Sequence, residues 1–463
     1  MNKILNKDKS QIEKLLLLAK QSATNFLNNI DNRETSCDTK VEISRVLNEH
    51  GLGAEASLSQ FIDKFDQVIV SSSGPRYWGF VTGGATPAAI VGDWLATVYD
   101  QNTQTVSGSG DASAIIELET IQLLLDLFDL PQSFLGGFVT GATMSNFTCL
   151  ATARQWLGKQ QAIDIAKTGV PANLKILSAT PHSSAIKCLS MLGIGSNNLI
   201  PVKTLAAGRE AIDINDLKQQ IALLQGQAFI LISSAGTVNT VDFDDFVEIA
   251  KLKQNHNFWW HIDAAFGGFA ACSPQYKHLL KDWDKADSIT IDCHKWLNVP
   301  YESAVYFIKD EYSKLQVETF QNSNAPYLGD PMNNFNYLNF LPENSRRLRA
   351  LPAWFTLMAY GKQGYQDIVE SCVAMTQSLA QFIDENEHFE LLAAVHLNTV
   401  CFKLSDDKQN INLFLKQLNQ SGKVFMTATV FAGQQAIRAA FVNWRTQQSD
   451  VEIAIDEMLS FIQ

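Results

Sequence analysis

Short apolar runs alternate with amphipathic patterns of helical period through residues 76–345, and this alternation constrains the fold more than any other feature. The runs expected to form strands are 136–141, 175–179, 228–233, 258–262, 288–292 and 303–309. The helices between them are expected at 143–157, 183–192, 214–224 and 243–254. This alternation predicts an α/β chain with a mostly parallel sheet covered on both faces. Ligands of such sheets bind at the carboxyl ends of the strands.

The two ends of the chain follow different patterns. Residues 1–75 have apolar side chains at helical spacing and end at a polar break, so we expect an N-terminal helical arm that packs on another surface. Beyond residue 345, helices and short strands are expected at 351–362, 365–385, 390–392, 399–404, 437–441 and 450–462. The chain therefore divides into the arm (1–75), a large domain (76–345) and a smaller α+β domain (346–463).

Charge and cysteine content exclude several classes of partner. The formal net charge of -12 argues against binding to nucleic acid or to an anionic membrane. The seven cysteines are scattered and never spaced as C-x-x-C, which argues against a disulfide framework and a zinc site and favours reduced thiols in the cytoplasm. The apolar run Leu15–Ala19 is too short for a signal sequence or a membrane span. We therefore expect a cytoplasmic chain without a metal site.

Lys295 directly follows the expected strand 288–292, in the segment His294-Lys295-Trp296. A single lysine at the rim of a sheet usually extends its amine into water while its stem packs on apolar surface. A desolvated amine near other cations instead loses its proton more readily and can attack a carbonyl carbon. The flanking histidine and tryptophan favour the second environment, which makes Lys295 a candidate for covalent cofactor binding.

Asp263 follows another expected strand, 258–262, and precedes Ala264 and Ala265. An aspartate at such a place is often a cap or turn residue. In a pyridoxal-5′-phosphate (PLP) site, a carboxylate instead keeps the pyridine nitrogen protonated, so that the ring withdraws electrons from the substrate. Asp263 precedes Lys295 by 32 residues, which fits one helix and one strand between them and puts both at adjacent strand ends.

Two further segments stand at expected helix starts. The small residues of Thr140–Asn146 open a helix, and free N–H groups at such a start bind phosphate. Many helices begin this way, so this signal is weak alone. His182, in Thr180–Ser184, also follows a strand. A single histidine there is more often a cap or a packed residue, and the sharper alternative is an imidazole stacked on a flat cofactor.

Together, these segments resemble the group II PLP-dependent amino-acid decarboxylases, which include the aromatic-amino-acid, glutamate, histidine and 2,4-diaminobutyrate decarboxylases. The resemblance extends from about residue 76 to the C-terminus. It rests on five ordered motifs: His182, Gly236-Thr237, His261-x-Asp263-Ala264-Ala265, Ala286-Asp287-Ser288 and His294-Lys295-Trp296. The family implies the aspartate-aminotransferase-like PLP fold (fold type I), with a mixed, mostly parallel sheet. It also implies a homodimer with a shared active site.

The resemblance implies a role for each matched residue. Lys295 resembles the lysine that holds PLP as a Schiff base, Asp263 the partner of the pyridine nitrogen, and His182 the residue stacked on the ring near the substrate carboxylate. The remaining matches are implied to contact the cofactor, with Ala142, Thr143 and His294 at the phosphate and Thr237 and Ala265 beside the ring.

Two more matches concern the type of reaction. Tyr327 resembles the loop tyrosine that helps to protonate the substrate carbon after CO2 leaves, and its surroundings (321–336) have the Asn, Gly and Pro content of a lid. Arg438 resembles the arginine that binds the substrate α-carboxylate, a task suited to a bidentate guanidinium. Packing of Tyr327 on the body and a salt bridge of Arg438 are the simpler alternatives. The resemblance implies decarboxylation of an L-amino acid to an amine and CO2.

The sequence leaves the substrate open among aromatic, acidic and diamino acids. Tyr301-Glu302-Ser303 and the stretch 76–80 depart from the family pattern on the substrate side. Aromatic residues there could hold an indole or a phenol, or could pack in the core: Tyr77, Trp78 and Phe80. Two other functions stay open, namely another PLP-dependent lyase or aldehyde synthase on the same fold, and a catalytically silent PLP-binding protein. The presence of Lys295, Asp263 and His182 disfavours the silent protein.

Overall fold

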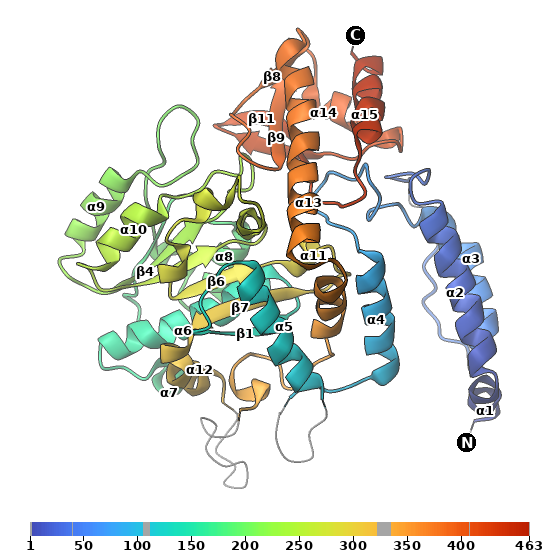
Figure 1. Ribbon diagram of the computed structural model, residues 1–463, viewed down its shortest axis with the longest axis horizontal. Coiled ribbons are helices and arrows are strands. Elements are labelled where there is room, and N and C mark those ends of the chain that lie inside the picture. The colour runs from blue at the N-terminus through green and yellow to red at the C-terminus, as the bar shows by residue number, and fades with distance from the viewer. Residues whose placement is uncertain (1, 39, 105–111, 322–334, 407, 463) are drawn as a thin grey trace.

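A seven-stranded sheet forms the centre of the computed structural model, which describes residues 2–38, 40–104, 112–321, 335–406 and 408–462 (Figure 1). The strands are β1 (Phe134–Val139), β2 (Ile176–Ser178), β3 (Leu199–Pro201), β4 (Phe229–Ser234), β5 (Phe258–Asp263), β6 (Ser288–Ile291) and β7 (Ala304–Lys309). Their order across the sheet is β1-β7-β6-β5-β4-β2-β3. Strand β7 runs opposite in direction to the other six strands, so the predicted mixed, mostly parallel sheet is confirmed.

Both faces of this sheet are buried, as its near-continuous apolar strands require. Ile230 belongs to the apolar cluster on the face covered by α6 (Ala142–Gln160) and α8 (Ser183–Met191), whereas Leu231 belongs to the cluster on the opposite face. Trp259 and Trp260 divide in the same way, because successive side chains of a strand point to opposite faces. The opposite face is covered mainly by α5 (Ser113–Leu127), α9 (Ile214–Leu223) and α10 (Phe246–Lys253).

A four-stranded antiparallel sheet forms the smaller C-terminal part, in the order β10-β11-β9-β8. Its elements are β8 (Phe389–Leu391), β9 (Thr399–Leu404), α14 (Ile411–Gln420), β10 (Thr427–Phe431), β11 (Gln434–Ala440) and α15 (Gln448–Ser460). The long helix α13 (Ala350–Glu385) runs from the large sheet to this part (Figure 1). Gly361, with φ +58°, interrupts its helical geometry close to the expected break between two helices.

The N-terminal region is less helical than expected. Helices α1 (Lys3–Ser10), α2 (Ile12–Asn28) and α3 (Ala54–Phe65) are present, but the described residues from 29 to 53 form no helix or strand. Helices α2 and α3 lie side by side along the outer flank of the molecule, beyond α4 (Pro87–Tyr99) (Figure 1). None of the three N-terminal helices has a fully buried residue, and several of their apolar side chains are exposed, among them Ile12, Leu16 and Phe61.

The segment that follows the arm joins the two parts of the molecule. Phe425 donates its backbone N–H to the carbonyl of Arg76 (3.0 Å), and Ala440 donates to the carbonyl of Trp78 (2.9 Å). Residues 76–78 therefore run beside the C-terminal sheet although the sequence grouped them with the large domain. The division at residues 75 and 345 stays a prediction. Among the described residues, no helix has the length and apolar character needed to cross a membrane.

Candidate active site

One cavity lies at the carboxyl ends of the parallel strands, where the sequence predicted a ligand site. Lys295 follows β6, Asp263 ends β5 and His182 follows β2, so the parallel order brings all three to one edge of the sheet. The lining residues are Phe80, Val81, Ala142, Thr180, His182, Ser234, Gly236, Thr237, Val238, Asp263, Ala265, Phe266, Lys295 and Arg438.

Lys295 lies in the short helix α11 (Cys293–Trp296) with its side chain 15% exposed. Its Nζ is 3.2 Å from Oδ2 of Asp292 and 5.4 Å from the ring centroid of Phe266. Gly83 packs directly against its backbone, since a Cβ added at Gly83 would lie 1.6 Å from the Lys295 carbonyl oxygen. The amine is therefore held at the cavity by packing on its backbone and an ion pair at its tip.

A chain of buried hydrogen bonds orients Asp263. Trp259 Nε1 donates to Ser288 Oγ (2.8 Å), and Ser288 Oγ lies 2.9 Å from His261 Nδ1. His261 Nε2 is 3.0 Å from Asn146 Oδ1, and Asn146 Nδ2 donates to Asp263 Oδ2 (3.0 Å). Because the amide oxygen can only accept, His261 carries its proton on Nε2, and Ser288 donates to Nδ1.

The electrostatics of this hydrogen-bond chain favour a neutral His261 imidazole beside the Asp263 carboxylate. Complete burial lowers the pKa of His261 to about 4, although the charge of Asp263 opposes this shift. The second oxygen of Asp263 accepts from the backbone N–H of Ala265 (3.2 Å). Donors from two directions stabilise the negative charge of Asp263, which a pyridinium partner requires. The sequence motif contained His261, but neither its role nor that of Asn146 was recognised.

His182 stands at the N-cap of α8, as the cap interpretation predicted, and it also lines the cavity. Its Nδ1 accepts from the backbone N–H of Ser184 (3.2 Å) and is 2.7 Å from Ser184 Oγ. Burial lowers the pKa of this imidazole, and the charge of Asp263 partly offsets the effect. With Nδ1 occupied as an acceptor, the neutral ring carries its proton on Nε2.

The N-terminus of α6 meets a carboxylate that the sequence interpretation overlooked. The backbone N–H of Ala142 donates to Asp292 Oδ1 (3.0 Å), and the same oxygen is 3.4 Å from His294 Nε2. Ser303 donates its backbone N–H to His294 Nδ1 (3.3 Å), so the neutral ring presents Nε2–H to Asp292. Thr143 is the next residue of α6. A charged residue at the end of an apolar strand was the available signal for Asp292.

Arg438 reaches the cavity from β11 of the smaller sheet and is 8% exposed. Its Nη1 donates to the backbone carbonyl of Val238 (2.8 Å). Its Nε is buried and has no hydrogen-bond partner within the described part of the chain. A buried guanidinium with spare donors at a cavity suits an anionic ligand such as a carboxylate.

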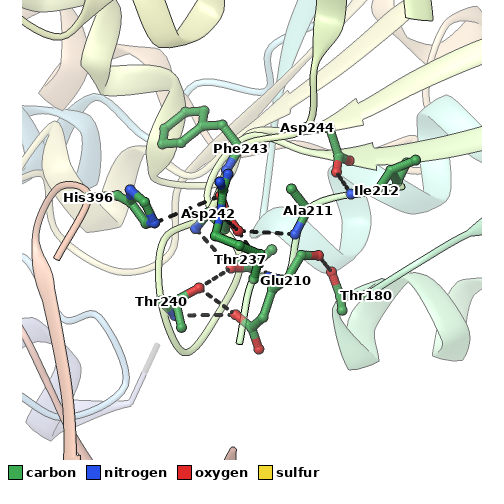
Figure 2. Close-up of polar contacts among 11 residues, drawn as sticks. Thr180, Glu210, Ala211, Ile212, Thr237, Thr240, Asp242, Phe243, Asp244 and His396 are labelled. Atoms are coloured by element: carbon green, nitrogen blue, oxygen red, sulfur yellow. Dashed lines mark hydrogen bonds and ion pairs between the residues drawn. The ribbon is translucent and has the colours of Figure 1, made fainter. Parts of the chain in front are cut away.

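The loop that contains Thr237 is held by a polar network (Figure 2). Thr237 Oγ1 accepts from the backbone N–H of Asp242 (2.9 Å) and lies 3.1 Å from Thr240 Oγ1. Glu210 accepts from both the backbone and the hydroxyl of Thr240 (3.2 and 2.9 Å). Asp242 in turn forms a bidentate pair with Arg209 (2.7 and 2.6 Å). This network holds the loop that presents Thr237, Val238 and the contact to Arg438.

The aromatic residues near the entrance separate into packing and lining residues. Trp78 is 1% exposed and packs on Phe441, and Tyr77 stacks on Phe425 with centroids 4.5 Å apart. Phe80 is 63% exposed and lines the cavity. Of the three predicted aromatic candidates, only Phe80 is therefore available to a substrate. Tyr327 lies outside the described residues.

The cavity has the chemistry that PLP requires. An amine, a carboxylate supported by two donors and a neutral imidazole come together in Lys295, Asp263 and His182. Ala265 adds only a methyl group to the wall between them, which leaves space for a flat ring. The N-terminus of the 19-residue helix α6 lies at the same cavity, and the positive end of its dipole suits an anionic group such as a phosphate.

Comparison with known proteins supports this interpretation. Residues 54–405 match the model of the pyridoxal-dependent decarboxylase conserved domain. An aromatic-L-amino-acid decarboxylase of Bacillus atrophaeus is 28% identical over 393 residues (81% of this chain, 79% of the relative), and a phenylacetaldehyde synthase of Petunia hybrida is 27% identical (79% of this chain, 76% of the relative). The crystal structure of Oryza sativa TDC with PLP and tryptamine superposes with a TM-score of 0.89 at 18% identity, covering 98% and 97% of the two chains.

The matched region covers most of the chain and includes all the lining residues of the cavity except Arg438. The predicted PLP fold, the PLP cofactor and the decarboxylation of an amino acid are thereby confirmed. The chain belongs to the pyridoxal-dependent decarboxylase family.

Proposed function

We propose that this decarboxylase acts on an aromatic L-amino acid and binds PLP covalently through Lys295. One observation carries the proposal, namely that a single cavity combines the Lys295 amine, the Asp263 carboxylate and the Arg438 guanidinium. These are the groups needed to hold a carbonyl cofactor, to keep its ring charged and to bind a carboxylate.

Each side chain has a separate task in the proposed reaction. PLP, when bound, supplies an electron sink for the bond that breaks at the substrate α-carbon. Asp263, held by Asn146, keeps a negative charge beside the pyridine nitrogen. Arg438 binds the substrate carboxylate and fixes the orientation of the bond to CO2. The neutral His182, with its proton on Nε2, is a hydrogen-bond donor inside the cavity, and it can pass this proton on as Nδ1 takes up another.

Five further contact residues and one loop residue complete the proposed site. Ala142, Thr143 and His294 are assigned to the cofactor phosphate, because the first two begin α6 and the third lies beside them. Thr237 and Ala265 are assigned to the sides of the ring because both line the cavity. Tyr327 is proposed to return the proton to the α-carbon together with His182.

The proposed substrate class rests on the apolar part of the cavity. Phe80, Val81 and Val238 line it, whereas Lys295 and Arg438 are the only lysine and arginine among its described lining residues. An acidic substrate needs a second cation for its side chain, and that cation is missing from this set. The relative from Bacillus atrophaeus, named as an aromatic-L-amino-acid decarboxylase, supports the same class.

We further propose a cytoplasmic homodimer. Val91, Trp94 and Val98 form one apolar face of α4 and are 52%, 45% and 64% exposed. A contiguous exposed face of this kind suits a subunit interface. It borders the site, because Trp94 shares a second cavity with Tyr301, whose ring lies 4.3 Å from that of His294. Size measurement by light scattering should give twice the chain mass, and Val98→Asp should shift it towards the monomer.

The decisive experiment measures CO2 release by the purified protein from aromatic, acidic and diamino L-amino acids. Release from tryptophan, tyrosine or phenylalanine, absent in Lys295→Ala, is the expected result. Release from glutamate or 2,4-diaminobutyrate alone would overturn the substrate class. No release from any of them would revive the catalytically silent alternative.

Measurement of the amine and aldehyde formed in the same reactions distinguishes an aldehyde synthase. Plain decarboxylation yields one amine per CO2, whereas an aldehyde synthase consumes O2 and water and yields one aldehyde, one ammonia and one hydrogen peroxide per CO2. Tyr327→Phe should slow amine formation and increase the share of oxidised product. An unchanged ratio of amine to aldehyde would exclude Tyr327 as the proton donor.

A further inference from the structure

Asp292 occupies a central position that the proposed reaction does not explain. It follows β6 directly, and its side chain is 5% exposed. Oδ1 accepts from Ala142 N–H (3.0 Å) and faces His294 Nε2 (3.4 Å), while Oδ2 is 3.2 Å from Lys295 Nζ. One carboxylate thus engages the first N–H of a long helix, an imidazole and the amine of the site.

These partners are the groups to which the cofactor must also bind. With the pyridine nitrogen at Asp263 and the aldehyde carbon at Lys295, the phosphate arm has to reach the lining residue Ala142 at the start of α6. There it meets a fixed negative charge that already accepts the N–H of Ala142 and lies beside His294. The Asp292 carboxylate and the phosphate carry like charges and would repel each other there, and burial reduces the screening of this repulsion by water.

We propose that Asp292 competes with the phosphate of PLP for the N-terminus of α6, so that this enzyme holds its cofactor in an exchangeable state. The inference rests on the proposed assignments of Lys295 and Asp263. Without cofactor, Asp292 stabilises the site by pairing with the Lys295 ammonium. Cofactor binding would engage the Lys295 nitrogen in a bond to PLP, which weakens its ion pair with Asp292, and would add a phosphate dianion, and both changes oppose binding. Asp292 is therefore a positioning residue that lowers the affinity for PLP.

The test compares wild type with Asp292→Asn, which keeps the shape and the acceptor for Ala142 but removes the charge. Apoprotein of the full chain is prepared, and the dissociation constant for PLP is measured by equilibrium dialysis. We expect about tenfold tighter binding in the variant. We also expect a lower melting temperature of the variant apoprotein, because Lys295 then lacks its anion.

The Asp292 charge has two effects, repulsion of the phosphate and pairing with Lys295. Pyridoxal, which lacks the phosphate, separates them. If repulsion of the phosphate dominates, Asp292→Asn improves the binding of PLP several-fold more than that of pyridoxal. Asp164→Asn is the matched control, since Asp164 pairs with Lys159 (3.2 Å) just beyond the C-terminal end of α6, about 28 Å along the helix. This control should leave both affinities unchanged.

Several outcomes would overturn the inference. Equal or weaker binding of PLP by Asp292→Asn would show that the carboxylate supports the cofactor or is neutral towards it. An equal gain for PLP and pyridoxal would assign the effect to Lys295 instead of the phosphate. Failure of wild type and variant to bind PLP at any concentration would instead refute the proposed site itself, so the two failures are distinguishable.

Discussion

Asn146 Nδ2 donates to Asp263 Oδ2 over 3.0 Å, and the oxygen of the same amide faces His261 Nε2 at the same distance. Asn146 belongs to α6 and Asp263 to β5, so this pair joins the helix that begins at the proposed phosphate site to the strand that ends at the proposed ring site. A chain of four hydrogen bonds links Trp259 to Asp263 by way of Ser288, His261 and Asn146. In each of these bonds the donor points towards the Asp263 carboxylate. A fully satisfied buried network of this kind holds one geometry.

Asn146→Ala should lower kcat by about tenfold, which corresponds to about 1.4 kcal/mol of transition-state stabilisation. The variant removes one donor to Asp263 and leaves His261 Nε2–H without its acceptor. Steady-state kinetics on an aromatic substrate check this, with Thr148→Ala on the same helix as control, because within the described ranges its hydroxyl bonds only to Met144 O. An unchanged kcat in Asn146→Ala would exclude a role for this amide in positioning Asp263.

His261 should make the folded state sensitive to acid. Burial lowers its folded pKa from 6.5 to about 4, so between these values the unfolded chain binds more protons than the folded chain. The contribution of His261 to the free energy of unfolding is fully present above pH 6.5. It falls by about 3 kcal/mol as the pH drops towards 4. Urea unfolding should show that the free energy of unfolding falls less between pH 7.5 and pH 5 for His261→Gln than for wild type. His256→Gln, at an exposed position, should behave as wild type.

Gly83→Ala should release the cofactor and destabilise the fold. A Cβ at this position would lie 1.6 Å from the carbonyl oxygen of Lys295, so the backbone of α11 must move. Overpacking of this kind costs about 2 kcal/mol or more. Melting temperature and PLP content of the purified protein check this. Gly51→Ala is the control, since its Cβ would be 3.9 Å from the flexible end of Ile4.

Phe80→Ala should raise KM for an aromatic substrate by about tenfold and change kcat less, because Phe80 provides apolar surface to the bound side chain. Phe61→Ala, on the exposed arm, should change neither constant. An aliphatic amino acid should have the same high KM with Phe80→Ala as with wild type, and this result would agree with the role of Phe80. An unchanged KM for the aromatic substrate would show that Phe80 does not contact it.

The sequence predicted the elements that end at the site better than the contacts between them. Lys295, Asp263 and His182 could be placed together because each follows a strand, and parallel strands share an edge. Asn146 and Asp263 are 117 residues apart, and Ala142 and Asp292 are 150 apart. Hydrogen bonds over such separations depend on how the helices pack, which local pattern does not specify.

Some helices and strands were not predicted because their sequences carry no clear local pattern. Strand β3 has only three residues, and α5 is apolar on several faces, so neither has a clear period. Trp78 and Phe80 are two residues apart and equally apolar, yet one is buried and the other lines the cavity. Phe80 and Val81 both have positive φ values (55° and 60°), and this turn gives the two aromatic residues different surroundings.

Arg438→Lys should raise KM by at least tenfold while the fold is retained. Nη1 of Arg438 already bonds to the carbonyl of Val238, and its other donors remain for the substrate carboxylate. A lysine has one ammonium on a flexible stem and cannot serve both partners with this geometry. The amine product lacks the carboxylate, so its inhibition constant should change much less than KM. An equal change in both constants would mean that Arg438 supports the loop at Val238 without contacting the carboxylate.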